Sequence, residues 1–319
     1  MKAVVYTEYG SPDVLKLKEV EKPVPKDDEV LIKVHAGSLN SSDWEFLNGT
    51  PQYIRMWGLL KPKYNILGSD ISGTVEAVGI NVRQFKVGDE VLGDNFMRWG
   101  GFAEYVCAPE NALVVKPDSM TFEEAATLPQ SGNIAVQGLS DKVTIQPGQK
   151  VLINGAGGGA GSFAVQVAKL YGAQVTGVDS TEKLEMMRSI GADQVIDYTK
   201  EDFTQNGQQY DLVLDMVASH SILDYRRALA ADGIYLMVGG SLGRILKTLI
   251  LGPLISMTGS RKMGILGVKT NKDLSSVVEL VEAGKIVPII DRVYKLSEVP
   301  EALRYFGEGH AKGKVVITV

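Results

Sequence analysis

The stretch VLINGAGGGAG, residues 151–161, decides the fold class of this chain. Its first residues predict a short buried strand, and residues 162–171 carry apolar side chains at helical spacing. Glycines between a strand and a helix allow a sharp turn and let a pyrophosphate touch the backbone, where the helix amino end offers unpaired N–H groups. The stretch therefore predicts a dinucleotide-binding loop, with a purely structural glycine turn as the alternative.

Apolar strands alternate with helical segments on the carboxyl side of this loop. Such alternation is typical of a doubly wound parallel sheet, so we predict an α/β fold with a Rossmann domain. The expected elements are strands at 174–178, 194–196, 211–214 and 233–238, and helices at 182–190 and 221–230.

The first 120 residues follow a different pattern, with short Val- and Ile-rich runs between Gly and Pro turns. Short strands at close spacing predict a β-rich barrel or sandwich; they are expected at 3–6, 30–34, 73–78, 90–92, 103–106 and 112–115. Thr121 and Glu124 have the spacing of a helix capping box, which marks the change of pattern.

The residues after 263 are too few to form a core of their own, so we expect them to return to the first domain. The predicted boundaries are 1–122 and 264–319 for a discontinuous β-rich domain, and 123–263 for the Rossmann domain.

Composition excludes several classes of protein. The 319 residues carry a net charge of −5, which gives no electrostatic footprint for nucleic acid. Cys107 is the single cysteine, so an intrachain disulfide and a cysteine-rich zinc site are both excluded. The amino terminus begins directly with a predicted strand, and we expect a reduced, cytoplasmic protein.

The apolar run at residues 245–257 needs its own interpretation. It is shorter than the ~18 residues that span a bilayer, and Gly252-Pro253 is expected to break it. Cationic residues flank the run, so a membrane-surface helix is one interpretation. Burial at a subunit or domain contact is the interpretation we favour, and no stable membrane insertion is expected.

The strand after the glycine loop ends with an acidic residue, Asp179, 18 residues beyond Gly161. An acidic side chain at this spacing binds the ribose hydroxyls of NAD. Ser180, Thr181 and Lys183 offer hydroxyls and an ammonium that would instead hold the 2′-phosphate of NADP. Charge and hydrogen bonding alone do not distinguish NAD from NADP as the cofactor.

Several motifs together resemble the medium-chain dehydrogenase/reductase superfamily, over essentially the whole chain. They are the glycine loop, Gly68-Ser69-Asp70, Gly73, Val75, Gly79, Val82, Gly88-Asp89, Val91, Gly191-Ala192-Asp193 and the ending Gly313-Lys314-Val315-Val316-Ile317. Within the superfamily the chain is similar to the zinc-free quinone oxidoreductases and enoyl reductases. The resemblance implies a GroES-like β-rich catalytic domain beside the Rossmann domain.

The chain differs from the zinc-dependent members of the superfamily at positions that decide which reaction can be catalysed. Those enzymes place a cysteine where this chain has Asn40 and Gly-His-Glu where it has Gly68-Ser69-Asp70, and their four-cysteine lobe is missing. Without a Lewis acid, an alkoxide has no strong partner, whereas an enolate can be stabilised by hydrogen-bond donors. We therefore predict hydride transfer from NAD(P)H to a lipophilic quinone or an α,β-unsaturated carbonyl, with no metal.

The resemblance also assigns catalytic candidates. Asn40 matches an asparagine beside the nicotinamide, and Tyr53 lies in the stretch where enoyl reductases carry a proton-donating tyrosine, with Tyr64 as a competitor. The three tryptophans are further candidates, either as an aromatic slot for a quinone ring or as core residues; they are Trp44, Trp57 and Trp99.

The same resemblance assigns the cofactor contacts. The phosphate loop residues are Gly155, Gly158, Gly159, Ala160 and Gly161, and the adenosine-side residues are Asp179, Ser180, Thr181, Lys183 and Tyr198. Val238, Gly239 and Gly240 are expected near the nicotinamide. Some NADPH-using relatives have a similar Ser-Thr pair, and Ser180 replaces the apolar residue expected after the aspartate in NAD users. The resemblance therefore favours NADPH slightly, although Asp179 is unusual among NADPH users.

Two competing functions stay open. One is an alcohol dehydrogenase, against which the missing metal ligands count; the other is a non-catalytic nucleotide-binding protein like the lens crystallins of this branch. The resemblance suggests a homodimer, with a small molecule rather than nucleic acid as the partner.

Overall fold

The structure is a computed structural model that describes residues 1–140 and 145–319, apart from the side chain of Trp57. The chain divides into two compact units. Unit 1 consists of Met1–Asn133, Thr270–Gly284 and Pro288–Val319, and unit 2 consists of Ile134–Lys269 and Lys285–Val287.

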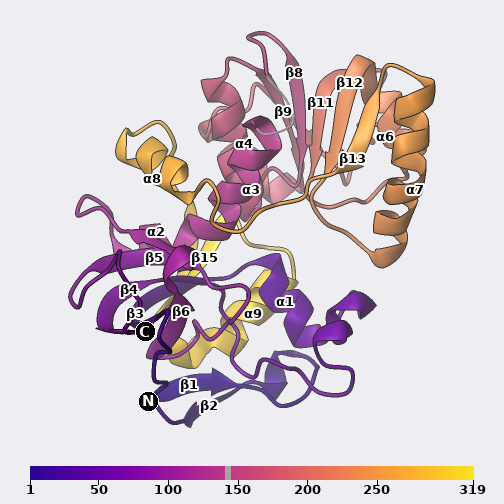
Figure 1. The fold of residues 1–319 in the computed structure, drawn as a ribbon. Coiled ribbons are helices and arrows are strands. Elements are labelled where there is room, and N and C mark those ends of the chain that lie inside the picture. The colour runs from indigo at the N-terminus through magenta and orange to yellow at the C-terminus, as the bar shows by residue number, and fades with distance from the viewer. Residues whose placement is uncertain (141–144) are drawn as a thin grey trace. The chain divides into compact units, whose positions relative to one another are not determined.

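Unit 2 holds a six-stranded parallel sheet in the order β10-β9-β8-β11-β12-β13. This order is the doubly wound arrangement in which the first strand, β8, lies beside the fourth. The predicted parallel sheet is thus confirmed (Figure 1). Its strands are β8 (Lys150–Asn154), β9 (Gln174–Asp179), β10 (Gln194–Asp197), β11 (Tyr210–Asp215), β12 (Leu229–Met237) and β13 (Lys262–Ile265).

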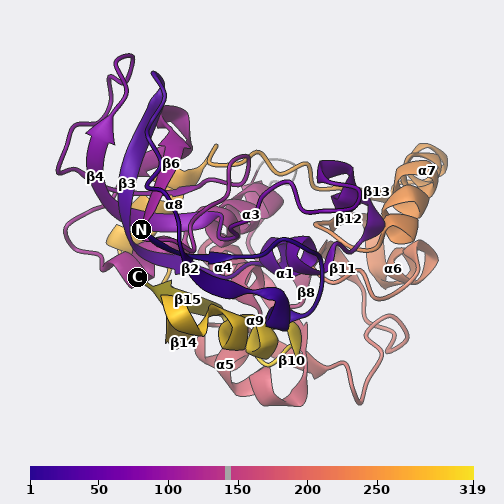
Figure 2. The same ribbon diagram turned by 90° about the horizontal axis from the view of Figure 1, so that it is seen from below.

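Helices cover this sheet. Helix α4 packs on β8 and β9, α6 on β12, and α7 on β13 (Figure 1). Helix α5 packs on β10 (Figure 2). Their bounds are α4 (Gly159–Leu170), α5 (Leu184–Ser189), α6 (Ile222–Ala228) and α7 (Leu242–Thr258).

The expected break at Gly252-Pro253 is wrong, because α7 continues through Pro253 as one helix of 17 residues. Close packing explains the continuity: a Cβ on Gly252 would lie 2.6 Å from the Met263 carbonyl oxygen on β13. Ser256 also ties the helix to this strand, since its Oγ donates to the Gly252 carbonyl and accepts from the Met263 N–H.

Unit 1 is built on a sheet in the order β14-β15-β3-β4-β5-β7, with β6 also paired to β3. The terminal strand β15 lies antiparallel to β3, so the last residues join the first domain as expected. The strands of this sheet are β3 (Glu29–Ser38), β4 (Asp70–Val78), β5 (Glu90–Asp94), β6 (Tyr105–Pro109), β7 (Leu113–Val115), β14 (Ile290–Lys295) and β15 (Lys314–Thr318). Strands β1 (Lys2–Val5) and β2 (Lys16–Glu19) form a separate two-stranded antiparallel sheet.

Short helices complete unit 1. Helix α2 begins at the predicted capping box, in which Thr121 Oγ1 accepts from the Glu124 N–H and the Glu124 carboxylate accepts from the Thr121 N–H. Helix α9 lies along β14 and β15 (Figure 2). The helices are α1 (Ser41–Asn48), the 3-10 segment η2 (Gln52–Trp57), α2 (Phe122–Thr127), α8 (Leu274–Glu282) and α9 (Val299–Gly307); α3 (Pro129–Ser140) contains a boundary between the units.

Candidate functional site

The glycine loop joins β8 to α4 in unit 2. Gly155 has φ +85°, a backbone conformation that favours glycine. A Cβ on Gly161 would lie 2.0 Å from the Gly155 carbonyl oxygen, so the helix reaches the loop only because residue 161 has no side chain. Gly158 is the N-cap of α4 and, like Gly159 and Ala160, is partly exposed. The N–H groups of residues 155–158 already donate within unit 2, so the N–H groups left for a ligand are those of the first helical residues, Gly159 and Ala160, at the amino end of a 12-residue helix.

Asp179 supports this loop from the end of β9. Its Oδ2 accepts a hydrogen bond from the Gly157 N–H at 2.9 Å, and its Oδ1 accepts from the Ser180 N–H at 2.9 Å. The Lys183 ammonium lies 3.4 Å from Oδ1, and both side chains are almost buried. The negative charge of Asp179 is thus compensated within the protein.

Three further residues surround the end of β9. The Ser180 hydroxyl is buried and has no hydrogen-bond partner among the described residues. The Thr181 hydroxyl donates to the Asp197 carboxylate, and Tyr198 is 59% exposed. Ser180 is therefore the residue of this group whose polar atom needs a partner from outside the chain.

A buried aspartate, Asp215, organises the carboxyl ends of β8, β11 and β12. Its Oδ1 accepts from Asn154 Nδ2 at 2.9 Å and from the Ala218 N–H at 2.8 Å, and its Oδ2 accepts from the Tyr235 hydroxyl at 2.8 Å. The Val238 N–H also bonds the Asp215 carbonyl oxygen, which positions the Val238–Gly240 segment.

Sequence reasoning did not find this group. The signal was an aspartate at the end of a buried strand at the point where strand order reverses, which is where ligands bind in such sheets.

Unit 1 contains a second buried polar group around Asn40, at the N-cap of α1. Asn40 Nδ2 donates to Asp70 Oδ2 at 2.8 Å, and Asn40 Oδ1 accepts from Lys314 Nζ at 2.6 Å. The amide is therefore held at both ends, and its orientation is determined. One hydrogen of Nδ2 has no partner among the described residues.

Asp70 is fully buried and accepts from four donors. Besides Asn40, these are the Ser38 hydroxyl at 3.2 Å, the Lys314 ammonium at 3.3 Å and the Gln130 N–H at 3.0 Å. Burial raises the pKa of Asp70 and lowers the pKa of Lys314, and their mutual attraction opposes both shifts.

Two more carboxyl groups lie near this pair. Burial raises the pKa of Asp43 to about 7, although its carboxylate accepts from the Asn40 and Gly68 N–H groups. Burial, with the charge of Asp70, raises the pKa of Asp94 to about 8. The group thus holds three aspartates around one ammonium, so part of it binds a proton near neutral pH.

Comparisons with known proteins bear on both groups. A family model described as alcohol dehydrogenase GroES-like domain matches residues 26–118, and one described as zinc-binding dehydrogenase matches residues 190–317. The 2-methylene-furan-3-one reductase of Solanum lycopersicum is 35% identical over 333 residues, covering 99% of this chain and 79% of the relative.

Two further similarities span the chain. The chloroplastic NADPH-dependent alkenal/one oxidoreductase of Arabidopsis thaliana is 34% identical over 332 residues, with the same two coverages of 99% and 79%. The solved structure of the quinone oxidoreductase from Coxiella burnetii is 30% identical with a TM-score of 0.90, covering 100% of this chain and 99% of that chain.

This chain belongs to the medium-chain dehydrogenase/reductase superfamily, in its quinone oxidoreductase branch. The family prediction and the fold class, a GroES-like β-rich domain with a Rossmann domain, are confirmed. The residues of unit 2 fit the superfamily's nicotinamide dinucleotide, because the glycine loop leaves room where a Cβ would intrude and Ser180 offers an orphaned hydroxyl.

The zinc ion of other superfamily members does not fit the residues of unit 1. Asn40 offers an amide, and both oxygens of Asp70 already accept hydrogen bonds. The Lys314 ammonium, 3.3 Å from Asp70, would repel a cation placed there. A catalytic zinc needs about three protein ligands, and no group of three or more His, Cys, Asp or Glu in residues 1–140 and 145–319 is arranged for a metal.

Tyr53 and Tyr64 differ in their hydroxyl groups. The Tyr64 hydroxyl donates to the Met97 carbonyl oxygen at 3.0 Å, whereas the Tyr53 hydroxyl has no partner among the described residues. Tyr53 is partly buried against the core of unit 1, and burial raises its pKa. Its phenol therefore stays protonated at neutral pH.

The tryptophans contribute mainly to packing. Trp99 is buried with its ring 4.5 Å from that of Phe46, and Trp44 packs so closely on α9 that a Cβ on Gly307 would lie 2.2 Å from its ring. The side chain of Trp57 lies outside the described part of the chain.

Proposed function

We propose that this chain is an NAD(P)H-dependent oxidoreductase that reduces a quinone or an α,β-unsaturated carbonyl acceptor without a metal ion. One observation supports this function above all: the Asn40 amide is clamped between Asp70 and Lys314 and keeps one N–H hydrogen free. Such a group stabilises an enolate oxygen, whereas the alkoxide from a simple ketone needs a Lewis acid. The two plant relatives are named for the reduction of enone acceptors.

When bound, the reduced nicotinamide supplies a hydride to an electrophilic carbon of the acceptor. Asn40 then donates its free Nδ2–H to the acceptor oxygen, on which negative charge develops. The Lys314 ammonium pulls electron density from Asn40 Oδ1 and thereby strengthens Nδ2–H as a donor. Because Lys314 and Asp70 act through Asn40, both are positioning residues.

Tyr53 is the proposed source of the proton that completes the reduction. Its hydroxyl is protonated at neutral pH and is not engaged by another described residue. Tyr64 is the weaker candidate, because its hydroxyl already donates to a backbone carbonyl.

NADPH is the cofactor we propose, held at the pyrophosphate by Gly155, Gly158, Gly159, Ala160 and Gly161. On the adenosine side, Ser180 and Lys183 would bind the 2′-phosphate. The Asp179 carboxylate accepts from the Gly157 N–H and is paired with the Lys183 ammonium, which weakens its repulsion of an anion. Thr181, Tyr198 and the segment Val238, Gly239 and Gly240 complete the proposed contacts.

The proposed division of labour assigns catalysis to unit 1 and nucleotide binding to unit 2. The predicted boundaries, 1–122 and 264–319 against 123–263, lie within about eleven residues of the main boundaries of these units. No helix among the described residues is long and apolar enough to cross a membrane. A cytoplasmic location and a homodimer are part of the proposal, as is a small lipophilic substrate.

The test is oxidation of NADPH and NADH with a panel of quinones, enones and simple ketones, with and without a chelator. We expect turnover with quinones or enones that the chelator leaves unchanged. The Asn40→Ala variant should lose about 10²- to 10³-fold in kcat, while Ser42→Ala, its neighbour on α1, should retain the wild-type rate.

Three outcomes would contradict this function. Activity that disappears with a chelator and returns with zinc indicates a metal-dependent alcohol dehydrogenase. Nucleotide binding without turnover of any acceptor indicates a non-catalytic binder. Unchanged turnover in Tyr53→Phe, with a loss in Tyr64→Phe, would transfer the proton-donating role to Tyr64.

A further inference from the structure

Helix α7 of unit 2 carries an apolar stripe that faces solvent along its whole length. The exposed residues recur at spacings of three and four, so they share one face of the helix. Leu246 is 48% exposed and Met257 82% exposed. The stripe consists of Leu242, Leu246, Leu249, Ile250, Pro253, Leu254 and Met257.

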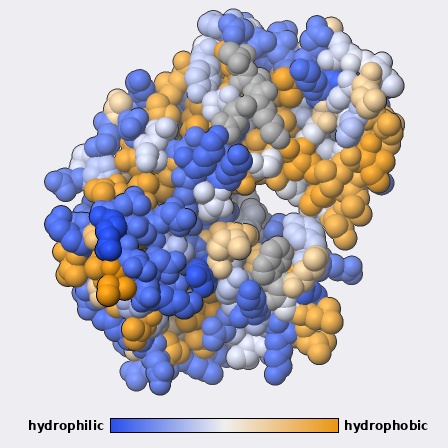
Figure 3. Space-filling model, in the orientation of Figure 1, coloured by the Kyte–Doolittle hydropathy of each residue, from blue (hydrophilic) through white to orange (hydrophobic). Residues whose placement is uncertain are grey.

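The opposite face of α7 is already used. Thr248 and Gly252 are buried, and Ile245, Leu251 and Ile255 pack against the core of unit 2 beside β12 and β13. At 1.5 Å per residue, the helix is about 25 Å long. Figure 3 shows the resulting hydrophobic surface gathered over α7. An exposed apolar surface of this extent marks an interaction site.

Charge indicates what this stripe contacts. Residues 233–269 contain no Asp or Glu, although the chain as a whole has 38 and a net charge of −5. The same stretch contains five cations, and none of the five forms an ion pair among the described residues; they are Arg244, Lys247, Arg261, Lys262 and Lys269.

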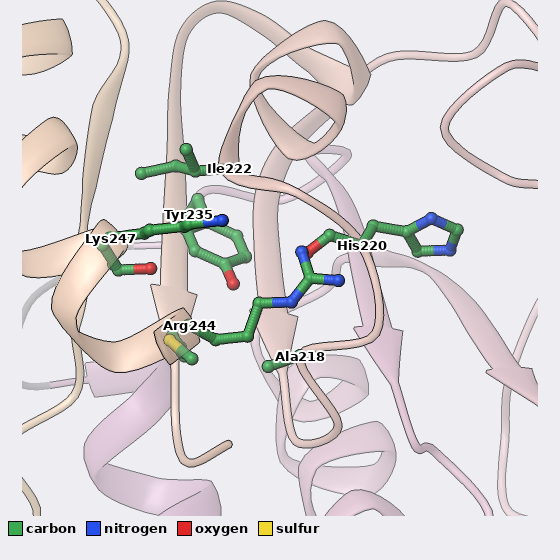
Figure 4. A pocket seen from close by; sticks show the side chains of 8 residues that line it. Ala218, His220, Ile222, Tyr235, Arg244 and Lys247 are labelled. Atoms are coloured by element: carbon green, nitrogen blue, oxygen red, sulfur yellow. The ribbon is translucent and has the colours of Figure 1, made fainter. Parts of the chain in front are cut away.

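At the amino end of α7, the Arg244 guanidinium contacts neighbouring backbone and lines a small cavity. Arg244 donates to the backbone carbonyls of Ser219 and His220, so its charge is bound but not neutralised. Arg244 and Lys247 line a small cavity with His220 and Tyr235 (Figure 4). Its volume of about 10 Å³ holds one water molecule, so it is not a substrate pocket.

We propose that the α7 stripe docks on an anionic lipid surface. An apolar helix face with flanking cations lies in a membrane interface, with its side chains among the acyl chains and its ammonium groups among the phosphates. A second copy of the chain is the poorer occupant, because a twofold contact through this stripe would bring identical cations together with no carboxylate between them. Docking of this kind is reversible and involves no membrane-spanning segment.

The experiment is co-sedimentation of the full chain with phosphatidylcholine vesicles that contain or lack phosphatidylglycerol. We expect binding only to the anionic vesicles, weakened by high salt. Leu249→Gln/Leu254→Gln should abolish binding, and Lys247→Glu/Lys262→Glu should weaken it by at least roughly thirtyfold. All four substituted side chains are exposed, so the circular dichroism spectra of the variants should match that of the wild type.

Matched controls are chosen from unit 1. Val24→Gln/Ile80→Gln removes two apolar side chains that are even more exposed than Leu249 and Leu254, and Lys16→Glu/Lys18→Glu reverses two exposed charges on β2. Both should bind vesicles like the wild type.

Binding to neutral vesicles alone, or none at all, would overturn the inference. A second contrary result combines two measurements: the wild type does not bind vesicles, and the stripe variant changes from dimer to monomer in analytical ultracentrifugation. A second copy of the chain would then be the partner that covers the stripe. Vesicle binding is measured without substrate or nucleotide, so its failure is separate from any failure of the proposed reductase activity.

Discussion

Asp215 in unit 2 and Asp70 in unit 1 are both fully buried and both accept hydrogen bonds from four donors, but the donors differ in charge. In unit 2, all donors to the Asp215 carboxylate are neutral groups. They are the Asn154 amide, the Tyr235 hydroxyl and the backbone N–H groups of Val217 and Ala218. In unit 1, Asp70 has the Lys314 ammonium among its donors, in a region where both side chains are at most 1% exposed. Neutral donors position a loop, whereas a buried ammonium also changes the polarity of the groups it touches.

The physical difference lies in what remains when one donor is lost. Asp215 without one neutral donor keeps the others and the same net charge. Asp70 without Lys314 becomes a buried charge with no counter-ion, which is far more costly.

Removing Lys314 should have the largest effect. Lys314→Met leaves Asp70 uncompensated and is expected to lower the free energy of unfolding by about 3–5 kcal/mol. The Lys314→Met/Asp70→Asn variant should recover much of this loss, because the buried charge is gone. Chemical denaturation measures both, and a double variant as unstable as the single one would show that the ion pair is not the cause.

The pH dependence of stability should be nearly as large and should belong to unit 1. Asp43 has a pKa raised from 3.8 to about 7, so its folded form holds a proton that the unfolded chain has already released. Its contribution is therefore complete below about pH 4 and is lost as the pH rises through about 7.

Asp43 should accordingly contribute about 2–3 kcal/mol to the unfolding free energy that the wild-type protein loses between about pH 5 and about pH 8, and the raised pKa values of Glu45 and Asp94 add to the same decline. In Asp43→Asn this decline should be smaller, whatever the effect of the substitution on stability at low pH. Denaturation curves at the two pH values decide the matter; an equal decline in the variant would assign the proton to another carboxyl group.

Removing a neutral donor from Asp215 should cost less. Tyr235→Phe deletes a hydroxyl that donates to a carboxylate at 2.8 Å, and a loss of about 1.5–3 kcal/mol is expected in thermal or chemical unfolding. Tyr6→Phe is the matched control, because the Tyr6 hydroxyl is buried without a hydrogen-bond partner among the described residues and its removal should be close to neutral. Equal losses in the two variants would mean that ring packing, not the hydrogen bond, is measured.

The smallest effect concerns Lys183, a largely buried lysine that unit 2 places beside the Asp179 carboxylate. Lys183→Met removes the cation next to Asp179 and should weaken NADPH binding about tenfold or more, with NADH affected less. Fluorescence titration with the two nucleotides measures the difference. A greater loss for NADH would show that Asp179, and not the Lys183 side chain, selects the cofactor.

Local sequence patterns determined much of this protein. The glycine loop, the alternating strands and helices, the capping box at Thr121 and the return of the terminal strand all depend on residue spacing and backbone preference, and the structure has them. These features act over a few residues or follow from burial periodicity, so no tertiary contact is needed to see them.

Other features required the folded chain. Asn40 was identified within its motif, but its clamp depends on Lys314, 274 residues away in the sequence. The Asp215 group joins the ends of separate strands, and α7 runs through Pro253 because Gly252 packs against β13. Spacing along the chain carries no information about which distant donors meet a buried carboxylate, since packing of the whole unit decides that.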